Sequence, residues 1–331
     1  MTVEVLTLGE CLISLVAREI GPLSEATAFD RHIAGAEANA AVGLARLGHR
    51  VGYIGRVGDD GLGRAIVHRL RGEGVDVSQL RADPAGTTGV MFRERRALGP
   101  AEIVYSRAGS AGSRLAPHDI DRAAADGLFD GARWLHLTGI TPALSGNARE
   151  AVTRSISIAR DAKMTISLDV NLRRRLWSDE TAAVALRPVV AAVDVVLGSP
   201  DELAVVADRG PADDPAAVVA SVLAMGPRTA VAKLGADGAL GQERGGAPVA
   251  SPATPVATVI DPVGAGDAFS AGFIAASLDG ADLPTALRTG NACGAAAVSA
   301  IGDLTGLPTT AELERLLVSG LGSAGSADTI R

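Results

Sequence analysis

Short apolar runs alternate along the chain with longer segments that have helical spacing. Runs rich in valine, leucine and isoleucine predict buried strands at 3–8, 51–54, 134–137, 165–168, 193–197 and 229–232. The segments between or beside them predict helices at 36–47, 62–71, 148–162, 180–191 and 216–225. Strands that alternate with helices in this way predict a mostly parallel sheet with helices on both of its faces.

Two stretches break this alternation. Residues 12–16 with 28–33, and residues 88–94 with 102–107, predict hairpin strands that no crossover helix joins. We expect them to form a small sheet at one edge of a single domain that spans 1–331. Because doubly wound sheets bind ligands outside the carboxyl ends of their strands, segments of about 11–34 and 86–113 are expected to form a lid there. Ordinary edge strands are the alternative.

Composition favours a globular protein with a large core and argues against nucleic-acid-binding and membrane proteins. The chain has 331 residues, of which 47% are hydrophobic and 3% aromatic, so a sizeable and mostly aliphatic core is expected. The net charge of −7 argues against a nucleic-acid-binding protein with a broad basic face. Two cysteines, no signal-peptide pattern and no apolar stretch of membrane-spanning length predict a cytoplasmic protein that does not enter a membrane.

The stretch 260–276, IDPVGAGDAFSAGFIAA, contains the most specific candidate chemistry. A β-like run at 257–260 leads into a loop with Gly264 and Gly266, and Asp267 then opens a long apolar helix. Free backbone N–H groups and the helix dipole at such a start favour a phosphate oxygen. An acid placed beside that anion suits removal of a proton from an attacking hydroxyl. A simple helix cap is the alternative for Asp267.

Other nucleotide and hydrolase motifs do not match. A dinucleotide fingerprint needs a third glycine where this chain has Phe269, and it belongs early in a chain. The Walker A, protein-kinase and G-x-S-x-G patterns are absent from the sequence, and the five histidines have no metal-site spacing.

Two long motifs resemble the signatures of the ribokinase/PfkB family of carbohydrate kinases. The stretch 34–66, AGAEANAAVGLARLGHRVGYIGRVGDDGLGRAI, is similar to the first signature, and DPVGAGDAFSAGF is similar to the second. The resemblance implies an ATP-dependent sugar kinase with a ribokinase-like three-layer α/β/α sandwich and a β-sheet lid. It also implies that Asp267 is the catalytic base, which the helix dipole keeps ionised, and that Gly264, Ala265 and Gly266 form the anion hole.

The resemblance extends to the nucleotide site. LGSPDE at 197–202 has the position of the family's N-x-x-E motif for hydrated magnesium, with Glu202 retained and Ser199 in place of the asparagine. A first-turn acid that complements the helix dipole is the alternative for Glu202. AVAKLGADGAL and TGNACGAAAVS resemble the segments that contact ATP, which implies contacts from Lys233, Gly235, Gly238 and Asn291. ATP and Mg²⁺ are thus the implied cofactors, and a monovalent cation remains an open option.

The middle of the chain resembles 2-keto-3-deoxygluconate kinases more than other sugar kinases. The segments IVYSRAGSAGSRLAP, LHLTGITPALS and LDVNLRRRLWS carry this likeness. It implies a sugar-acid site formed by Gly35, Asn39, Tyr105, Arg107, Ile140, Arg173 and Asp303. Arginine suits a carboxylate because its planar guanidinium forms two parallel hydrogen bonds. For Arg173 the alternative is a solvated basic cluster with Arg174 and Arg175. Met91 stands where a tyrosine is expected, which leaves the sugar's stereochemistry open.

The leading hypothesis is therefore a kinase that phosphorylates the terminal hydroxyl of 2-keto-3-deoxygluconate. A fructokinase-like kinase of a neutral sugar is one alternative. A sugar or nucleotide sensor without turnover is another, although the intact GAGD sequence argues against it. The expected partners are the sugar and ATP, with no nucleic acid or membrane. We also expect a homo-oligomer, a dimer or higher, because exposed strand edges of the lid are usually covered.

Overall fold

The computed structural model describes residues 2–96, 101–210 and 213–322. Within them, the strands of the main sheet are β1 (Val5–Gly9), β4 (Val51–Gly58), β5 (Leu80–Asp83), β8 (Trp134–Thr138), β9 (Thr165–Asp169), β10 (Val195–Gly198), β11 (Thr229–Lys233), β12 (Ala239–Glu243) and β13 (Val249–Ser251). They form a nine-stranded sheet in the order β13-β12-β11-β10-β9-β8-β1-β4-β5. The strands from β11 to β5 are parallel, and β12 and β13 pair antiparallel at one edge. This confirms the predicted mostly parallel sheet.

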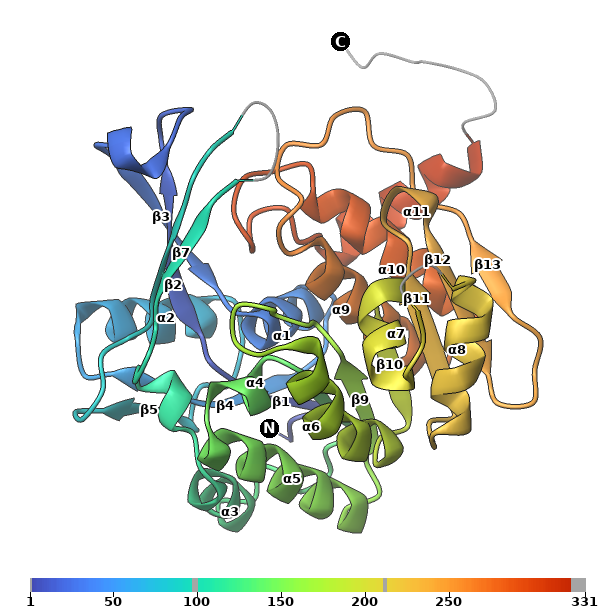
Figure 1. Ribbon diagram of the computed structural model, residues 1–331, viewed down its shortest axis with the longest axis horizontal. Coiled ribbons are helices and arrows are strands. Elements are labelled where there is room, and N and C mark those ends of the chain that lie inside the picture. Colours follow the sequence, from blue (N-terminus) through green and yellow to red (C-terminus); the bar gives the residue numbers. More distant parts are fainter. Residues whose placement is uncertain (1, 97–100, 211–212, 323–331) are drawn as a thin grey trace.

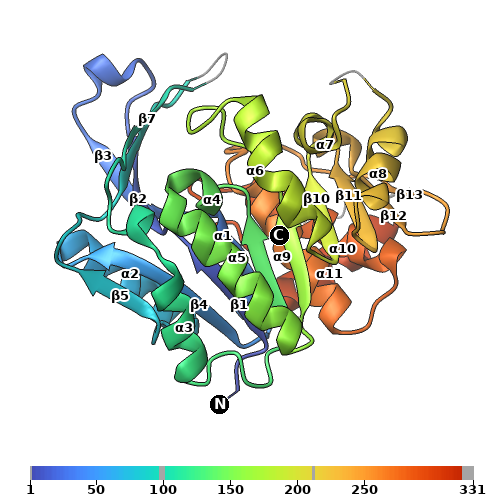
Figure 2. The same ribbon diagram turned by 60° about the horizontal axis from the view of Figure 1, so that its bottom comes forward.

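Helices cover both faces of this sheet (Figures 1 and 2). One core cluster includes residues of α3 (Pro117–Ala125), α5 (Gly146–Asp161), α6 (Asp179–Ala191), α7 (Pro200–Ala207) and α8 (Pro215–Ala224). The other includes residues of α1 (Ala36–Arg46), α2 (Gly61–Gly72), α9 (Ala265–Leu278), α10 (Leu283–Ala297) and α11 (Thr310–Gly322). The shorter helices are α4 (Thr141–Leu144), η1 (Leu23–Glu25), η2 (Gly112–Arg114) and η3 (Gly235–Asp237). The two cores, which are mostly aliphatic, confirm the three-layer sandwich.

A second, four-stranded sheet stands apart from the main sheet (Figure 1). It consists of β2 (Leu12–Ala17), β3 (Phe29–Ala34), β6 (Val90–Arg93) and β7 (Ile103–Ser106), in the order β3-β2-β6-β7. Two antiparallel hairpins, β2–β3 and β6–β7, are joined by parallel pairing of β2 with β6. Along β6, Met91 and Arg93 are buried while the alternate residues are half-buried, because successive side chains of a strand point to opposite faces. We call this sheet the lid.

The structure differs from the sequence-based expectation around the glycine-rich loop. Residues 257–260 form no strand, and Val259 and Ile260 are 60% and 54% exposed. The amides of Ile260 and Asp261 bond to the carbonyl of Val298, which is a loop residue rather than a neighbouring strand. High β-propensity alone therefore does not form a strand here, because the run has no strand to pair with.

The start of α9 and the end of α11 also differ from what the sequence predicts. Helix α9 begins at Ala265, so Asp267 lies inside its first turn instead of opening it. Helix α11 continues to Gly322, although the composition after Val318 predicts a mobile tail, and residues 323–331 lie outside the described residues. Among the helices that the structure describes, none combines the length and the hydropathy that a membrane crossing requires.

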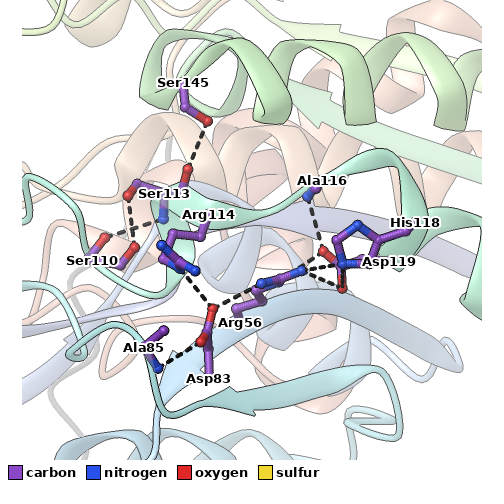
Figure 3. A network of polar contacts seen from close by, with 10 residues as sticks. All are labelled: Arg56, Asp83, Ala85, Ser110, Ser113, Arg114, Ala116, His118, Asp119 and Ser145. Carbon is purple, nitrogen blue, oxygen red and sulfur yellow. Dashed lines mark hydrogen bonds and ion pairs between the residues drawn. The ribbon is translucent and has the colours of Figure 1, made fainter.

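A network of ion pairs fastens the segment that follows the lid to the main sheet (Figure 3). Arg56 on β4 contacts Asp83 of β5 at 2.9 Å and both oxygens of Asp119 in α3 at 2.9 and 3.1 Å. Asp83 also accepts a hydrogen bond from Arg114 of η2 at 3.0 Å. We call Arg56, Asp83 and Asp119 the body cluster. It holds the connection from β7 to α3 against the sheet.

Candidate active site

A cavity of about 960 Å³ lies at the carboxyl ends of the parallel strands and extends under the lid. This is the position at which doubly wound sheets bind ligands. Its lining includes most of the residues that the sequence predicts for the site: Gly35, Asn39, Tyr105, Arg107, Ile140, Arg173, Ser199, Glu202, Lys233, Gly235, Gly264, Gly266, Asp267 and Asp303. Among the described residues, three that the sequence predicts for the site do not line this cavity: Ala265, Gly238 and Asn291. The fold thus brings residues from both ends of the chain to one place.

The start of α9 forms one wall of this cavity. Gly264 is the N-cap residue, with a φ of 83° that a side chain would strain, and it makes no side-chain cap. The first N–H groups of an α-helix have no acceptor within the helix. Here the amide of Ala265 donates to the carbonyl oxygen of Pro262 at 3.5 Å, and those of Gly266 and Asp267 remain available as donors. A Cβ at Gly266 would lie 3.2 Å from Nζ of Lys233. Glycine therefore keeps the space between the helix start and this ammonium open, which suits an anionic ligand.

Asp267 lies at this helix start with its carboxylate held from two sides. Its Oδ2 accepts a hydrogen bond from Nδ2 of Asn39 on α1 at 2.8 Å, and its Oδ1 accepts one from Nδ2 of Asn171 after β9 at 2.9 Å. Neither bond is a helix-capping bond to the backbone. Burial, followed by the nearby charge of Asp169, raises the pKa of Asp267 above its ordinary value, against the hydrogen bond from Asn39. This direction is opposite to the effect expected from the helix dipole alone.

A buried ion pair lies beside Asp267. Nζ of Lys233, at the end of β11, is 2.6 Å from Oδ2 of Asp169 at the end of β9. Burial acts to lower the pKa of Lys233, but Asp169 and Glu202 raise it overall, so the ammonium stays charged. Oδ1 of Asp169 is buried and has no hydrogen-bond partner among the described residues. The wall therefore combines a fixed cation with a polar atom that a bound group can use.

Glu202 is already used by the backbone around it. Its Oε1 accepts a hydrogen bond from the amide of Leu172, and its Oε2 accepts one from the amide of Ser199, both at 2.8 Å. Together with Ser199 it forms a capping box at the start of α7. Within residues 2–96, 101–210 and 213–322, no group of three or more His, Cys, Asp or Glu side chains could hold a metal ion. Because both oxygens of Glu202 already accept a backbone hydrogen bond, a Mg²⁺ ion here would take most of its ligands from elsewhere, as a hydrated Mg²⁺ does.

The two arginines expected to bind a carboxylate have different surroundings. Nε of Arg107 is 2.7 Å from Oε2 of Glu10, which follows β1, and the guanidinium makes a second contact with the same carboxylate. Arg107 also lies over the ring of Tyr105, 5.4 Å from its centroid. Arg173, in contrast, has only long contacts to backbone oxygens and makes no ion pair within the described part of the chain. Of these two arginines, Arg173 is therefore the one whose guanidinium remains for an anionic ligand.

Gly35 and Asp303 are two further residues that line the cavity. Gly35 has a φ of 137°, and a Cβ there would lie 2.6 Å from the carbonyl oxygen of Glu10, so only glycine fits. Asp303 accepts a hydrogen bond from Nδ2 of Asn39 at 3.3 Å. Burial raises the pKa of Asp303 to about 6, against the opposing charge of Arg93. Met91 pairs with Tyr105 across β6 and β7, and both line the cavity.

Asn291 and Gly238 support a neighbouring segment instead of the cavity. Nδ2 of Asn291 lies 3.0 to 3.1 Å from the carbonyl oxygens of Ser251 and Pro252 and from the hydroxyl of Ser251. A Cβ at Gly238 would lie 2.1 Å from the carbonyl oxygen of Ser251. Both residues thus keep the chain after β13 close to α10 and β12.

Sequence reasoning missed five polar residues of the site: Glu10, Asp169, Asn171, Arg93 and Asp261. The first three end or directly follow a parallel strand at its carboxyl end, and that position was the available signal. Arg93 lies on the same face of β6 as Met91. Nη2 of Arg93 lies 2.7 and 2.8 Å from the two oxygens of Asp261, and its Nη1 lies 3.2 Å from Oδ1 of Asp303. We call Arg93, Asp261 and Asp303 the lid cluster.

Known proteins resemble this chain over nearly its whole length. The profile of a family described as "pfkB family carbohydrate kinase" matches residues 3–310. A 2-dehydro-3-deoxygluconokinase from Thermoproteus tenax is 39% identical over 319 residues, which are 95% of this chain and 94% of that protein. A 2-dehydro-3-deoxygalactonokinase from Haloferax volcanii is 34% identical over 323 residues, 97% of this chain and 98% of that protein. The structure of a putative ribokinase II from E. coli, in complex with ATP and Mg²⁺, has a TM-score of 0.87 at 28% identity and covers 96% of this chain and 99% of that one.

Proposed function

The chain belongs to the pfkB family of carbohydrate kinases, and we propose that it transfers the γ-phosphoryl group of ATP to the terminal hydroxyl of a 2-keto-3-deoxy sugar acid. 2-Keto-3-deoxygluconate, also called 2-dehydro-3-deoxygluconate, is the leading substrate. The observation that carries the substrate class is Arg173, which lines the cavity and makes no ion pair within the described residues. The names of two relatives, kinases of 2-dehydro-3-deoxy sugar acids, support it.

In this proposal Asp267 is the general base. The substrate hydroxyl oxygen forms a bond to the γ-phosphorus, the bond from that phosphorus to the β–γ bridging oxygen breaks, and the hydroxyl proton passes to Asp267. The two amide donors, Asn39 and Asn171, fix the orientation of the carboxylate. Its raised pKa makes it a better proton acceptor than an exposed aspartate, because base strength rises with pKa.

The start of α9 and Lys233 then stabilise the transferred group. The amides of Gly266 and Asp267 are free to donate to the developing negative charge, while that of Ala265 donates to the carbonyl oxygen of Pro262 at 3.5 Å. The ammonium of Lys233 lies next to Gly266. Ser199 and Gly235 line the same side of the cavity and are proposed to contact ATP. Mg²⁺ would be held by the phosphates and water, and it supplies charge neutralisation there. Glu202 contributes by holding the backbone of Ser199 and Leu172.

We assign the sugar carboxylate to Arg173 and the orientation of the sugar to the residues around it. Arg107 already has Glu10 as its partner. We therefore assign it two other roles: it packs over the ring of Tyr105, and its remaining N–H groups donate to hydroxyls of the sugar. Asn39 and Asp303 are placed to contact further hydroxyls, while Gly35 and Ile140 shape the wall. Met91 offers an apolar surface where a hydroxyl would discriminate between epimers, so both the gluco and galacto forms are candidates.

A coupled assay of ADP release over a panel of sugars tests the proposal. The panel contains 2-keto-3-deoxygluconate, its galacto epimer, fructose and ribose, and we expect turnover of the sugar acids. Replacing Arg173 with Met should lower kcat/KM for a sugar acid by roughly 10- to 150-fold, the range for a lost charge-assisted hydrogen bond. Better turnover of fructose would favour the neutral-sugar kinase. No ADP release with any sugar would favour a sensor.

Two further properties follow from the same structure. The lid has two open edges, β3 and β7, which supports a homodimer in which these edges are covered; a monomer in light scattering would contradict it. Three buried carboxylates near α9 contact a cation of the chain: Asp261 and Asp303 contact Arg93, and Asp169 contacts Lys233. We therefore propose that the enzyme requires no monovalent cation.

A further inference from the structure

One lid residue reaches beyond the sugar side of the cavity to the loop that precedes α9. Arg93 is the last residue of β6, and its side chain is 8% exposed. Its guanidinium contacts both oxygens of Asp261 and one oxygen of Asp303. The contacts span 168 and 210 positions of sequence. They connect the lid to the two loops that flank α9 and α10.

Asp261 also contacts the backbone of both loops, the one before α9 and the one after α10. Its Oδ1 accepts a hydrogen bond from the amide of Val263, and its Oδ2 accepts one from the amide of Gly302, each at 3.1 Å. One carboxylate therefore binds the lid, the start of the segment 261–267 and the loop after α10. Residues 261–264 of this segment form a loop without strand pairing, and they lead into the first turn of α9.

Asp303 continues the connection to the proposed base. Its Oδ1 contacts Arg93, and its Oδ2 accepts a hydrogen bond from Nδ2 of Asn39. The same Nδ2 donates to Asp267 at 2.8 Å. A change at Arg93 therefore alters both the loop that carries the proposed anion hole and the amide that orients the proposed base.

We propose that Arg93 is a positioning residue of the phosphoryl-transfer reaction, which couples the lid to the loop 261–264 before α9 and to Asp267. The role rests on the kinase function proposed above. Its physical basis is that Asp261 and Asp303 are both buried carboxylates, which are costly to bury unless a cation compensates them. Through these contacts Arg93 holds the loop before α9, the lid and Asn39 in fixed positions relative to one another. Without it the carboxylates separate or protonate, and the alignment of Asp267 is lost.

The body cluster supplies a matched control. Arg56 also contacts two aspartates, and its side chain is 14% exposed, but its partners lie in the main domain, away from the cavity. We expect Arg93→Met to lower kcat by about 10- to 100-fold, in the range for a misplaced catalytic group, with little change in KM for ATP. Arg56→Met should keep kcat near that of the wild type. An unchanged kcat in Arg93→Met, or equal losses in both variants, would overturn the proposal.

Hydrogen exchange measured by mass spectrometry tests the coupling without turnover, so it remains valid even if the proposed substrate is wrong. We expect Arg93→Met to speed amide exchange in both 90–93 and 261–267, and Arg56→Met to leave both segments unchanged. If Arg93→Met does not fold, Arg93→Lys carries the test, because lysine keeps the charge but cannot form the bidentate contact. It should show a smaller loss of kcat and faster exchange in 261–267. Wild-type kcat and exchange in Arg93→Lys would contradict the proposal.

Discussion

Two arginines of this protein, the half-buried Arg56 and the buried Arg93, each contact two aspartates, but the clusters that they form differ in place and in charge. Arg56 joins β4, β5 and α3 within the main domain, whereas Arg93 joins the lid to the loops around α9 and α10. Burial acts to raise the pKa of Asp83 in the body cluster, but hydrogen bonds from Ala85, Arg114 and Arg56 lower it overall. In the lid cluster, burial raises the pKa of Asp303 to about 6 in spite of Arg93.

The difference shows what a similar set of residues can do in two settings. In the body cluster Asp83 accepts hydrogen bonds from Arg56, Arg114 and the amide of Ala85, which together keep it ionised. Its ion pair with Arg56 is therefore a stable structural contact. In the lid cluster one guanidinium serves two buried acids, and Asp267 adds a third negative charge nearby. That cluster is therefore sensitive to protonation, to substitution and to the position of the lid. We expect changes in the body cluster to affect stability and changes in the lid cluster to affect turnover.

The largest expected effect comes from Asp267, which is connected to the lid cluster through Asn39. Asp267→Asn keeps the shape of the side chain but removes the proposed base, so kcat should fall by about 10²- to 10⁴-fold. ATP should still bind, which calorimetry can measure, because the free amides at the start of α9 remain. No substitution in the body cluster should approach this loss. Near-normal turnover in Asp267→Asn would remove the basis for calling it the base.

The two clusters should also respond differently to pH. Above about pH 6 Asp303 is ionised and pairs with Arg93, so kcat/KM should fall as the pH decreases through this value. Asp267 lies close by and also has a raised pKa, so both acids contribute to this limb. In Asp303→Asn the contribution near pH 6 should be missing from the profile, while Asp83→Asn should keep the wild-type profile. An identical acid limb in wild type and Asp303→Asn would contradict this assignment.

The effect of pH on stability should have opposite signs in the two clusters. The pKa of Asp303 is raised by folding, so its contribution is fully present below the ordinary pKa of 3.8 and is lost as the pH rises through about 6. The pKa of Asp83 is lowered, so its contribution is present above 3.8 and is lost as the pH falls through the folded-state value. Thermal unfolding of Asp303→Asn and Asp83→Asn between about pH 3 and 7 measures both signs. The same sign for both would refute the contrast.

The body cluster should show its effect in the free energy of unfolding. Arg56→Met leaves Asp83 and Asp119 without their shared cation, and losing one partner of a buried ion pair costs about 3–5 kcal/mol. Because Arg114 and backbone amides still bond to Asp83, the lower end of that range is expected. Denaturant unfolding gives the value. A variant with wild-type stability would show that the body cluster contributes little.

The smallest expected effect is that of a monovalent cation. Since Arg93 and Lys233 already contact three of the buried carboxylates near α9, turnover should be similar in potassium, sodium or tetramethylammonium salts of equal ionic strength. Strong activation by potassium alone would show that the lid cluster does not complete the charge balance.

The main sheet, its flanking helices and most residues of the cavity could be predicted from local patterns. Asp267 and its glycines form a contiguous motif, and a contiguous motif can be read without knowledge of the fold. The run 257–260 was predicted wrongly because its apolar residues indicate extended backbone but not whether a partner strand exists. The pairing of Arg107 with Glu10 could not be predicted for a similar reason, because the two residues are 97 positions apart and only the fold brings them together. This pairing decides which of the two predicted arginines, Arg107 or Arg173, remains for the substrate.

The lid cluster was the least predictable part of the site. Arg93 carries no motif, and its two partners are brought to it only by the placement of the lid against the loops. Alternation along β6 indicates that Arg93 and Met91 share a face, but it does not indicate what that face meets. Long-range charge pairing of this kind depends on tertiary structure and appears only once the fold is known.

A double-mutant cycle between Arg93 and Asp267 tests most directly whether the lid cluster acts through the catalytic carboxylate. The measurement is kcat for wild type, Arg93→Met, Asp267→Asn and the double variant under saturating ATP and sugar acid. If Arg93 acts by positioning Asp267, its replacement should cost little further activity once Asp267 is already Asn, because residues that act as a unit are strongly non-additive. If Arg93→Met lowers kcat by the same factor in both backgrounds, the two residues act independently and the account is wrong.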